Sequence, residues 1–229
     1  QVNGTWQWDG TMIGGTSSTG GITYTYANSN VNIYGGNLTA KAGQTAATGG
    51  GLFFIAQDRS TIENTAGQKD AAYASTVNIY NGNLHGGSSA KNGGNIYVAH
   101  YSNLNVYGGY IHDGTAADKG GNIYFGGKGV LVLENANIYN GIAQNSNGNL
   151  YPTKNNLYAT NNIYGGYPEC VHVATIQDGQ EVLSHEYTLA NALKNLTEGS
   201  YLKLMRDLTV DTEITGQVTM DLNGCDLSG

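Results

Sequence analysis

Several residue types are scarce in this chain, and each shortage excludes a class of protein. Two cysteines in 229 residues are too few for a disulfide-stabilised scaffold, and their spacing does not match a zinc site. Charged residues make up only 12% of the chain, against a usual share of about 25%. No apolar run approaches the roughly 20 residues that a membrane-spanning helix needs. We therefore expect neither a disulfide-rich mini-domain nor a membrane protein.

The shortage of cations also limits the choice of partner. Ten Lys and Arg residues stand against 17 Asp and Glu, which gives a formal net charge of −7 and a pI near 5.0. So few scattered cations cannot neutralise a row of phosphates, so we expect no nucleic acid and no anionic membrane as partner. A pectin-like anionic polymer is disfavoured for the same reason. A neutral ligand is the better expectation.

Glycine and tyrosine are abundant, with 35 and 17 residues respectively, and asparagine recurs beside them. The glycines lack the period of three that collagen requires, and the aliphatic and tyrosine content is too high for a disordered tract. A phrase of asparagine, an aliphatic residue, tyrosine, any residue and glycine occurs five times. It begins at Asn32, Asn78, Asn105, Asn137 and Asn162.

A second phrase, Gly-Asn-Ile/Leu-Tyr, shows the period of the repeat. It begins at Gly94, Gly121 and Gly148, and a looser copy begins at Gly51. Its tyrosines, Tyr97, Tyr124 and Tyr151, are evenly spaced, and Tyr80 and Tyr107 are separated by the same interval. The chain therefore contains an internal repeat of about 27 residues, which is typical of a solenoid.

The alternation within each repeat predicts short, half-buried strands. In one repeat the inward residues are Ile96, Val98, Leu104, Val106 and Ile111. Three short strands per repeat with no helix between them fit one turn of a parallel β-helix, with Gly and Asn at the corners. We predict an all-β fold, a right-handed parallel β-helix with one short C-terminal α-helix. A seven-stranded sandwich is the alternative, but it would not repeat the same phrases at this spacing.

The phrases divide the chain near Cys170. Residues 1–169 are predicted to be β-helix coils with an N-terminal cap strand that carries Trp6 and Trp8, and with an insertion near 58–75. Residues 170–229 are predicted to contain a helix, with Leu189, Ala192, Leu193 and Leu196 on one face between Thr188 and Gly199. Strand-like runs follow at 201–205, 208–210 and 218–222. This tail either caps the solenoid or begins another, and Cys170 either pairs with Cys225 or is a small buried residue.

Alternation places the tyrosines of both phrases on the outer surface, in rows along the stack. One predicted row contains Phe54, Tyr97, Tyr124 and Tyr151, and the other contains Tyr34, Tyr80, Tyr107, Tyr139 and Tyr164. An amide row of Asn32, Asn78, Asn105, Asn137 and Asn162 is predicted beside the second. Such rings either stabilise one another, by about 0.5–1.5 kcal/mol per pair, or form a flat aromatic strip for an extended neutral sugar chain. On the second interpretation the ligand-binding residues are Tyr80, Tyr107, Tyr139, Tyr164, Tyr97, Tyr124, Tyr151, Asn105 and Asn137.

An enzyme is the competing hypothesis, because pectate lyases and polygalacturonases are parallel β-helices. The chain lacks an adjacent Asp pair, a Gly-His-Gly and an Arg-x-Lys, so the resemblance to those enzymes stops at the coil. The nearest cluster is His85 and His112, one repeat apart and predicted to stack, with Asp113, Asp118 and Lys119 nearby. It fits either a metal or acid–base site or a solvated turn. We therefore predict neither catalytic nor metal-binding residues.

Two smaller clusters of charged residues give no stronger indication of a functional site. Asp58 and Arg59 in the insertion fit a surface ion pair, which contributes little to stability. Asp207, Asp211 and Glu213 carry the oxygen ligands that calcium prefers, but their spacing matches no known loop. We predict no cofactor, with a bound calcium ion as the alternative.

The coil phrases, the segment from Tyr187 to Leu193 and the final Leu222-Asn223-Gly224 resemble the secreted β-helix repeat modules of fibre-degrading gut bacteria. The chain most resembles the xylan-binding modules of carbohydrate-binding module family 89, over about residues 20–229. That resemblance implies a secreted or cell-surface, non-catalytic module that holds a covalently linked catalytic domain on plant cell-wall polysaccharide, with xylan as the first expectation. A β-helix polysaccharide lyase or glycoside hydrolase and a structural or adhesive repeat module remain the alternatives.

Overall fold

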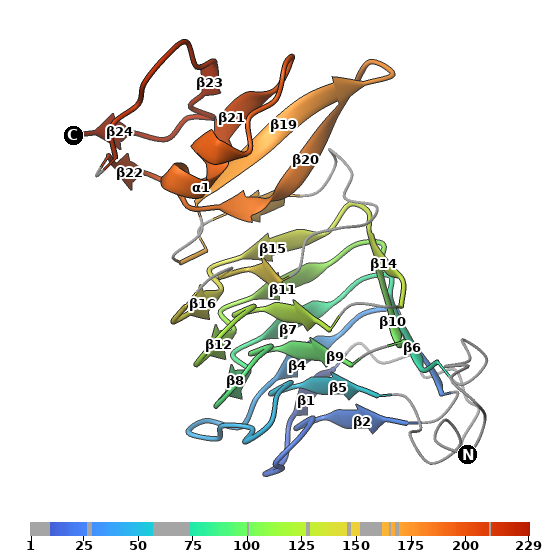
Figure 1. Ribbon diagram of the computed structural model, residues 1–229. Coiled ribbons are helices and arrows are strands. Elements are labelled where there is room, and N and C mark those ends of the chain that lie inside the picture. The colour runs from blue at the N-terminus through green and yellow to red at the C-terminus, as the bar shows by residue number, and fades with distance from the viewer. Residues whose placement is uncertain are drawn as a thin grey trace, which may run out of the picture.

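Short parallel strands, stacked coil upon coil, make up most of this protein. The computed structural model describes residues 10–26, 29–56, 74–99, 101–126, 129–145, 148–151, 162–164, 166–167, 170–210 and 212–229. Coils follow one another from the blue N-terminal strands to the yellow ones, and the orange and red C-terminal part covers the last coil (Figure 1). In each sheet of the coils the strands follow chain order and pair in parallel, which confirms the predicted all-β parallel β-helix.

Each full coil contains four strands, one more than the sequence predicted. The coil that starts at Ile96 contains β9 (Ile96–Val98), β10 (Asn103–Val106), β11 (Tyr110–His112) and β12 (Thr115–Ala116). The fourth strand escaped prediction because it has only two residues and no large apolar side chain. Its backbone nevertheless pairs in parallel on both sides, with β8 (Ser88–Ser89) and β16 (Ile142–Ala143).

The strands of successive coils form four faces, which we name by their number of strands. The three-stranded face contains β8, β12 and β16. The five-stranded face contains β2 (Thr23–Thr25), β5 (Phe53–Ile55), β9, β13 (Ile123–Phe125) and β17 (Leu150–Tyr151). The four-stranded face contains β3 (Asn30–Ile33), β6 (Thr76–Ile79), β10 and β14 (Leu131–Leu133). The six-stranded face contains β1 (Thr11–Ile13), β4 (Asn37–Thr39), β7 (Asn83–His85), β11, β15 (Asn137–Tyr139) and β18 (Asn162–Tyr164).

The predicted inward residues form the core of the coils. Ile96, Val98, Leu104, Val106 and Ile111 are all fully buried. They belong to one continuous apolar cluster that runs through the stack, because each inward position meets an aliphatic or aromatic residue in the next coil. The alternation in the sequence was therefore a reliable guide to the core.

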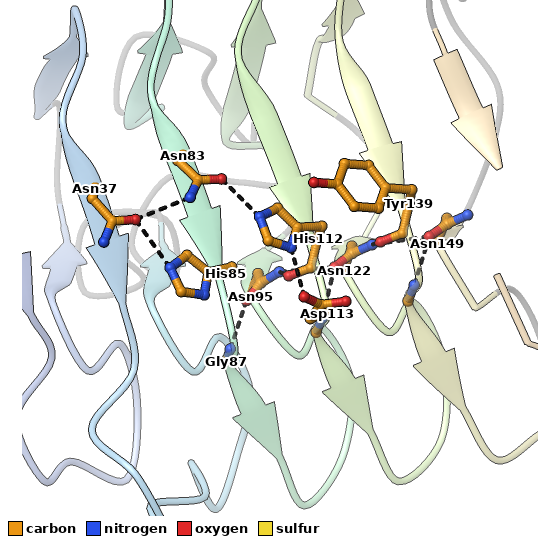
Figure 2. A network of polar contacts seen from close by, with 12 residues as sticks. Asn37, Asn83, His85, Gly87, Asn95, His112, Asp113, Asn122, Tyr139 and Asn149 are labelled. Atoms are coloured by element: carbon orange, nitrogen blue, oxygen red, sulfur yellow. Dashed lines mark hydrogen bonds and ion pairs between the residues drawn. The ribbon is translucent and has the colours of Figure 1, made fainter. Parts of the chain in front are cut away.

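The asparagines of the Gly-Asn phrase are also inside, which the sequence analysis did not foresee. Asn95, Asn122 and Asn149 are fully buried and form a hydrogen-bonded ladder. Asn95 Nδ2 donates to Asn122 Oδ1 at 2.8 Å, and Asn122 Nδ2 donates to Asn149 Oδ1 at 2.9 Å. The same oxygens accept backbone N–H groups at the corner before each short fourth strand, as from Gly87 to Asn95 at 2.7 Å (Figure 2) and from Gly114 to Asn122 at 2.9 Å. The ladder thus pairs backbone groups that the corner would otherwise leave buried and unsatisfied.

Close approach of these corners explains one set of glycines. A Cβ atom on Gly114 would lie 2.2 Å from the carbonyl oxygen of Gly121 and 2.8 Å from Asn122 Oδ1. No side chain fits at that separation. Glycine at this corner is therefore required by the contact between the two segments.

A two-stranded hairpin covers the last coil of the β-helix. β19 (Val171–Gln177) and β20 (Gln180–Tyr187) pair antiparallel across Asp178 and Gly179, which both have positive φ, 51° and 77°. This hairpin is not among the predicted elements, although Asp-Gly between two strand-like runs is a strong hairpin signal. Ala174 and Leu183 on the hairpin join the apolar cluster of the coils, so the hairpin closes the core.

The predicted helix is present as α1 (Leu189–Lys194). Thr188 is its N-cap, with a side chain that accepts the backbone N–H of Asn191, and Leu189 and Ala192 are buried. The three predicted strand runs appear as β21 (Tyr201–Leu204), β22 (Leu208–Thr209) and β23 (Met220–Asp221), and a fourth strand, β24 (Leu227–Ser228), was not predicted. No helix of the described residues has the length and apolar character to cross a membrane.

Three sequence predictions about the ends of the chain have different outcomes. Cys170 and Cys225 are both free thiols, so they form no disulfide. The coils begin at β1, near the predicted N-terminal cap strand, because Thr11–Ile13 pairs in parallel with β4. Trp6, Trp8 and residues 58–73, which include Asp58 and Arg59, lie outside the described residues.

Candidate binding face

The first predicted tyrosine row exists and lies along the five-stranded face. The rings of Tyr24, Phe54, Tyr97, Tyr124 and Tyr151 stack in succession, with centroids 5.2, 4.6, 4.9 and 5.2 Å apart. Burial and the neighbouring phenols of Tyr97 and Tyr151 raise the pKa of Tyr124. The Lys119 ammonium lies 4.9 Å from the centre of the Tyr151 ring.

The second predicted row is wrong beyond its third member. Tyr34, Tyr80 and Tyr107 stack at 4.9 and 5.3 Å, but Tyr139 belongs to β15 on the six-stranded face. There it stacks on His112 with centroids 4.6 Å apart and planes 4° from parallel. The residue that follows Tyr107 by one coil is Glu134, whose backbone N–H donates to Val106. Tyr164 is in backbone register with Tyr139, and its side chain lies outside the described residues.

The predicted amide row divides in the same way. Asn78 donates to Asn32, and Asn105 donates to Asn78, each at 2.8 Å, along the four-stranded face. Asn137 instead lies on the six-stranded face, in register with Tyr110, and donates to the carbonyl of Gly109 at 3.1 Å. Asn162, in β18, is in backbone register with Asn137 on that same face. The prediction failed because the same phrase occurs at two corners of the coil, so shared letters did not mean shared position.

The stacked geometry also corrects the idea of a flat aromatic strip. The planes within the two tyrosine stacks lie 5° to 20° from parallel, at a separation close to the ~4.8 Å between paired strands. Each inner ring, such as Tyr80 or Tyr97, therefore has a neighbouring ring stacked on each of its two faces. A sugar that stacks on an aromatic ring needs an open face. These stacks offer solvent mainly ring edges and hydroxyl groups.

The six-stranded face is different, because it carries two adjacent rows of polar side chains. One row contains Asn37, Asn83, Tyr110 and Asn137, and the other contains Thr39, His85, His112 and Tyr139. Hydrogen bonds join the rows: His85 Nε2 donates to Asn37 Oδ1 at 3.0 Å and His112 Nε2 donates to Asn83 Oδ1 at 2.7 Å (Figure 2). Asn83 Nδ2 donates to Asn37 Oδ1 at 3.0 Å. The amides and imidazoles are thus held in fixed orientations at the coil repeat.

The predicted stacking of the two histidines is confirmed, but the larger charged cluster is not. His85 and His112 stack with centroids 5.0 Å apart and planes 4° from parallel. Burial, and then the charge of His112, lower the pKa of His85, against the opposing effect of Asp113. Asp118 binds Asn145 at 2.7 Å, and Lys119 lies over Tyr151, so neither joins the histidines.

Asp113 Oδ2 lies 2.7 Å from His112 Nδ1, and Asp113 has a φ of 51°. Gly86 and Asn140, one coil away on either side, have φ values of 73° and 52° at the same corner. Turn geometry therefore accounts for the conformation of Asp113. No group of three or more metal-binding side chains occurs in the described part of the chain, which omits Asp211.

Tyr110 is the residue on this face that the sequence analysis missed. Its side chain is 49% exposed, and its neighbours in register are the shorter side chains of Asn83 and Asn137. No aromatic ring stacks on Tyr110 among the residues that the structure describes, so no other ring competes with a ligand for its faces. Tyr110 lies outside both phrases, but its position two residues before His112 in an alternating strand places it outward.

Comparison with known proteins assigns no family, because the chain matches no protein-family model, no curated protein and no solved structure.

Proposed function

We propose that this protein is a non-catalytic module that binds an extended neutral polysaccharide along its six-stranded face. The observation that carries the proposal is the exposed ring of Tyr110, on which no described ring stacks, among two in-register rows of amide and imidazole groups. A sugar ring presents C–H groups on its faces and hydroxyl groups around its edge. Tyr110 can stack on the first, while Asn83, Asn137 and His85 can hydrogen-bond to the second.

The regularity of the solenoid supports a linear polymer as the ligand. Polar side chains of each row recur at every coil along the axis, so successive sugars of a chain lying along it would meet hydrogen-bonding groups at a constant interval. If Tyr110 buries about 60 Å² of apolar surface, the gain is about 1.5 kcal/mol. With a few hydrogen bonds of about 1 kcal/mol each and the cost of ordering the chain, we expect affinities in the millimolar range.

The net charge of −7 and the scarcity of cations favour a neutral polymer over an anionic one. The resemblance to xylan-binding modules makes xylan the first ligand to test. A covalently linked catalytic domain and a secreted or cell-surface location belong to the same proposal.

Affinity electrophoresis through gels that contain xylan, mixed-linkage glucan or polygalacturonate tests the proposal. We expect xylan to retard the protein, and Tyr110→Ala to abolish the retardation. Tyr80→Ala is the matched control, because Tyr80 is comparably exposed (42%) but lies in a stack on another face. Retardation that survives Tyr110→Ala and is lost with Tyr80→Ala would move the site to the tyrosine stacks.

A structural or adhesive repeat module is the second candidate, and the ring stacks favour it. Four stacked contacts on the five-stranded face and two on the four-stranded face are of a kind that stabilises the coils without any ligand. This candidate predicts no retardation in any gel. A lyase or hydrolase would release unsaturated uronides or new reducing ends, with loss of activity on changing His112 or Asp113.

A further inference from the structure

His172 in β19 is enclosed where the hairpin meets the last coil, and both nitrogens of its ring contact backbone carbonyl oxygens. The side chain is fully buried. Nδ1 lies 2.7 Å from the carbonyl oxygen of Ser184 in β20, and Nε2 lies 3.2 Å from the carbonyl oxygen of Ile163 in β18. The first contact lies within the hairpin, and the second joins the hairpin to the coils. One imidazole ring therefore bridges the two parts of the molecule.

The chemistry of these two contacts specifies the protonation state of the ring. A carbonyl oxygen accepts hydrogen bonds and cannot donate one, so each ring nitrogen needs its own proton to bond there. A neutral imidazole has one N–H group, and its second nitrogen would turn a lone pair toward a carbonyl oxygen. Such a pair of facing acceptors is destabilising in a buried site. The imidazolium ion, with two N–H groups, satisfies both contacts.

A β-bulge in the hairpin places Ser184 beside His172. The register between the two strands shifts between His172 and Ala174, so that two residues of β20 face one residue of β19. Bulges change the direction of groups on the bulged strand. The hydroxyl of Ser184 accepts the backbone N–H of Val173 at 2.8 Å, which holds the bulged residue next to the imidazole.

The charged side chains across the sheet from His172 are compatible with a cation at this position. Glu186 lies directly opposite in β20 and is 1% exposed, and opposite residues of antiparallel strands share one face of the sheet. Its buried carboxylate favours the charged form of the ring. Lys203 lies opposite in β21, but its ammonium is bound to Glu181 at 2.7 Å and lies 3.9 Å from Asp221.

The other elements packed against β19 add one further cation in the part of the chain that the structure describes. Arg206, which follows β21, acts on the Cys170 thiol together with Glu186. Burial raises the pKa of that thiol to about 11, so Cys170 itself is neutral. α1 packs on the other side of β19, and its one charged residue, Lys194, is exposed. Glu186 is therefore the anion across from His172, and Arg206 is the competing cation.

We infer that His172 is an imidazolium ion in the folded protein and acts as a proton-dependent latch between the hairpin and the last coil. When the ring loses a proton, the shorter contact with Ser184 keeps the remaining N–H. The contact with Ile163 then joins two lone pairs, so the hairpin loosens from the coil without unfolding. This inference does not depend on the proposed ligand.

The direction of the pH dependence follows from the unfolded chain, in which histidine binds a proton only below about pH 6.5. The folded protein binds this proton more readily than the unfolded one. The latch therefore contributes its full stability below about pH 6.5, and this contribution is lost as the pH rises through the range in which the folded ring deprotonates.

Nitrogen NMR of the histidine rings in the intact chain tests the protonation state. At about pH 7.5, about one unit above the ordinary histidine pKa, we expect both ring nitrogens of His172 to carry protons. His85 is the internal control, because burial and the charge of His112 lower its pKa, so one of its nitrogens should carry none. An unprotonated nitrogen in His172 at this pH would overturn the inference.

Hydrogen exchange tests the latch itself. The protection of the backbone amides in β19 and β20 is compared with that of β10, within the coils, so that the general effect of base on exchange cancels. We expect the hairpin to lose about tenfold of its relative protection as His172 deprotonates. His172→Gln should show the weaker protection at every pH, whereas the matched variant His85→Gln should behave as the unaltered chain. Protection that stays constant while His172 deprotonates, or that falls equally in His172→Gln, would overturn the inference.

Discussion

Glu186 Oε2 accepts a 2.6 Å hydrogen bond from Asn149 Nδ2, so the hairpin ends the buried amide ladder of the coils. Each ladder amide donates toward the C-terminal end of the stack, and a carboxylate, which only accepts, is a suitable terminus. Glu186 also accepts the backbone N–H of Gly166 at 3.3 Å and is 1% exposed. Its position therefore sets the register in which the hairpin docks on the last coil.

Replacement of Glu186 by alanine should destabilise the protein, because it removes the acceptor from buried donors. We expect a loss of about 1–3 kcal/mol in the free energy of unfolding, measured by urea denaturation. The control is Glu198→Ala, in an exposed segment after α1, with a change below about 0.5 kcal/mol. Equal effects of the two substitutions would contradict the docking role of Glu186.

The two amide ladders should differ sharply in their contribution to stability. Asn122→Ala removes hydrogen bonds to Gly114, Asn95, Asn149 and the carbonyl of Tyr139, all within the core. We expect it to cost about 2–4 kcal/mol, since several buried polar groups lose partners. Asn105→Ala, on the partly exposed ladder, should cost about 1 kcal/mol or less. Thermal denaturation of both variants measures the difference, and a larger loss for Asn105→Ala would refute this ranking.

Stability should fall in acid because of His85. Burial and the charge of His112 lower its pKa from the usual 6.5, so the unfolded chain binds a proton at His85 more readily than the folded one. The contribution is therefore fully present above pH 6.5 and is lost as the pH falls from 6.5 toward the lowered value. The dependence of unfolding free energy on pH in this window should be shallower in His85→Gln. An unchanged slope would show that the stacked histidines do not carry the effect.

The two thiols should react at different rates. Burial raises the pKa of Cys170 to about 11, so very little thiolate is present at neutral pH and the side chain is enclosed. The pKa of Cys225 is also raised, by burial and then by Asp207, but its side chain is partly exposed. Iodoacetamide with mass spectrometry should label Cys225 first in the native protein and both in urea. First labelling at Cys170 would contradict the described core.

Local alternation and the constant spacing of the repeat were enough to predict the coils, the inward residues, the first tyrosine row and the histidine stack. Tyr139 and Asn137 were misplaced because identical phrases were aligned by their letters. Tyr139 follows His112 by the same interval that separates His85 from His112, whereas its distance from Tyr107 is longer than one repeat. The spacing, which reflects the length of chain in one coil, was the better guide.

Other features depended on contacts that alternation does not encode. Asn122 is buried because it binds backbone groups of a neighbouring corner, and polar residues at corners normally face solvent. Glu186 is buried because the hairpin places it against Asn149. Tyr110 was overlooked because its open ring depends on short side chains in the coils on either side.

The location of the ligand tests the central claim most directly. Histidine-labelled protein, titrated with a xylan oligosaccharide, reports binding through the ring signals of His85 and His112 in two-dimensional NMR spectra. His172, which lies in β19 and is fully buried, is the internal control. We expect the signals of His85 and His112 to shift in a saturable manner while that of His172 stays in place. Saturable binding without any change at His85 and His112 would contradict recognition at the six-stranded face.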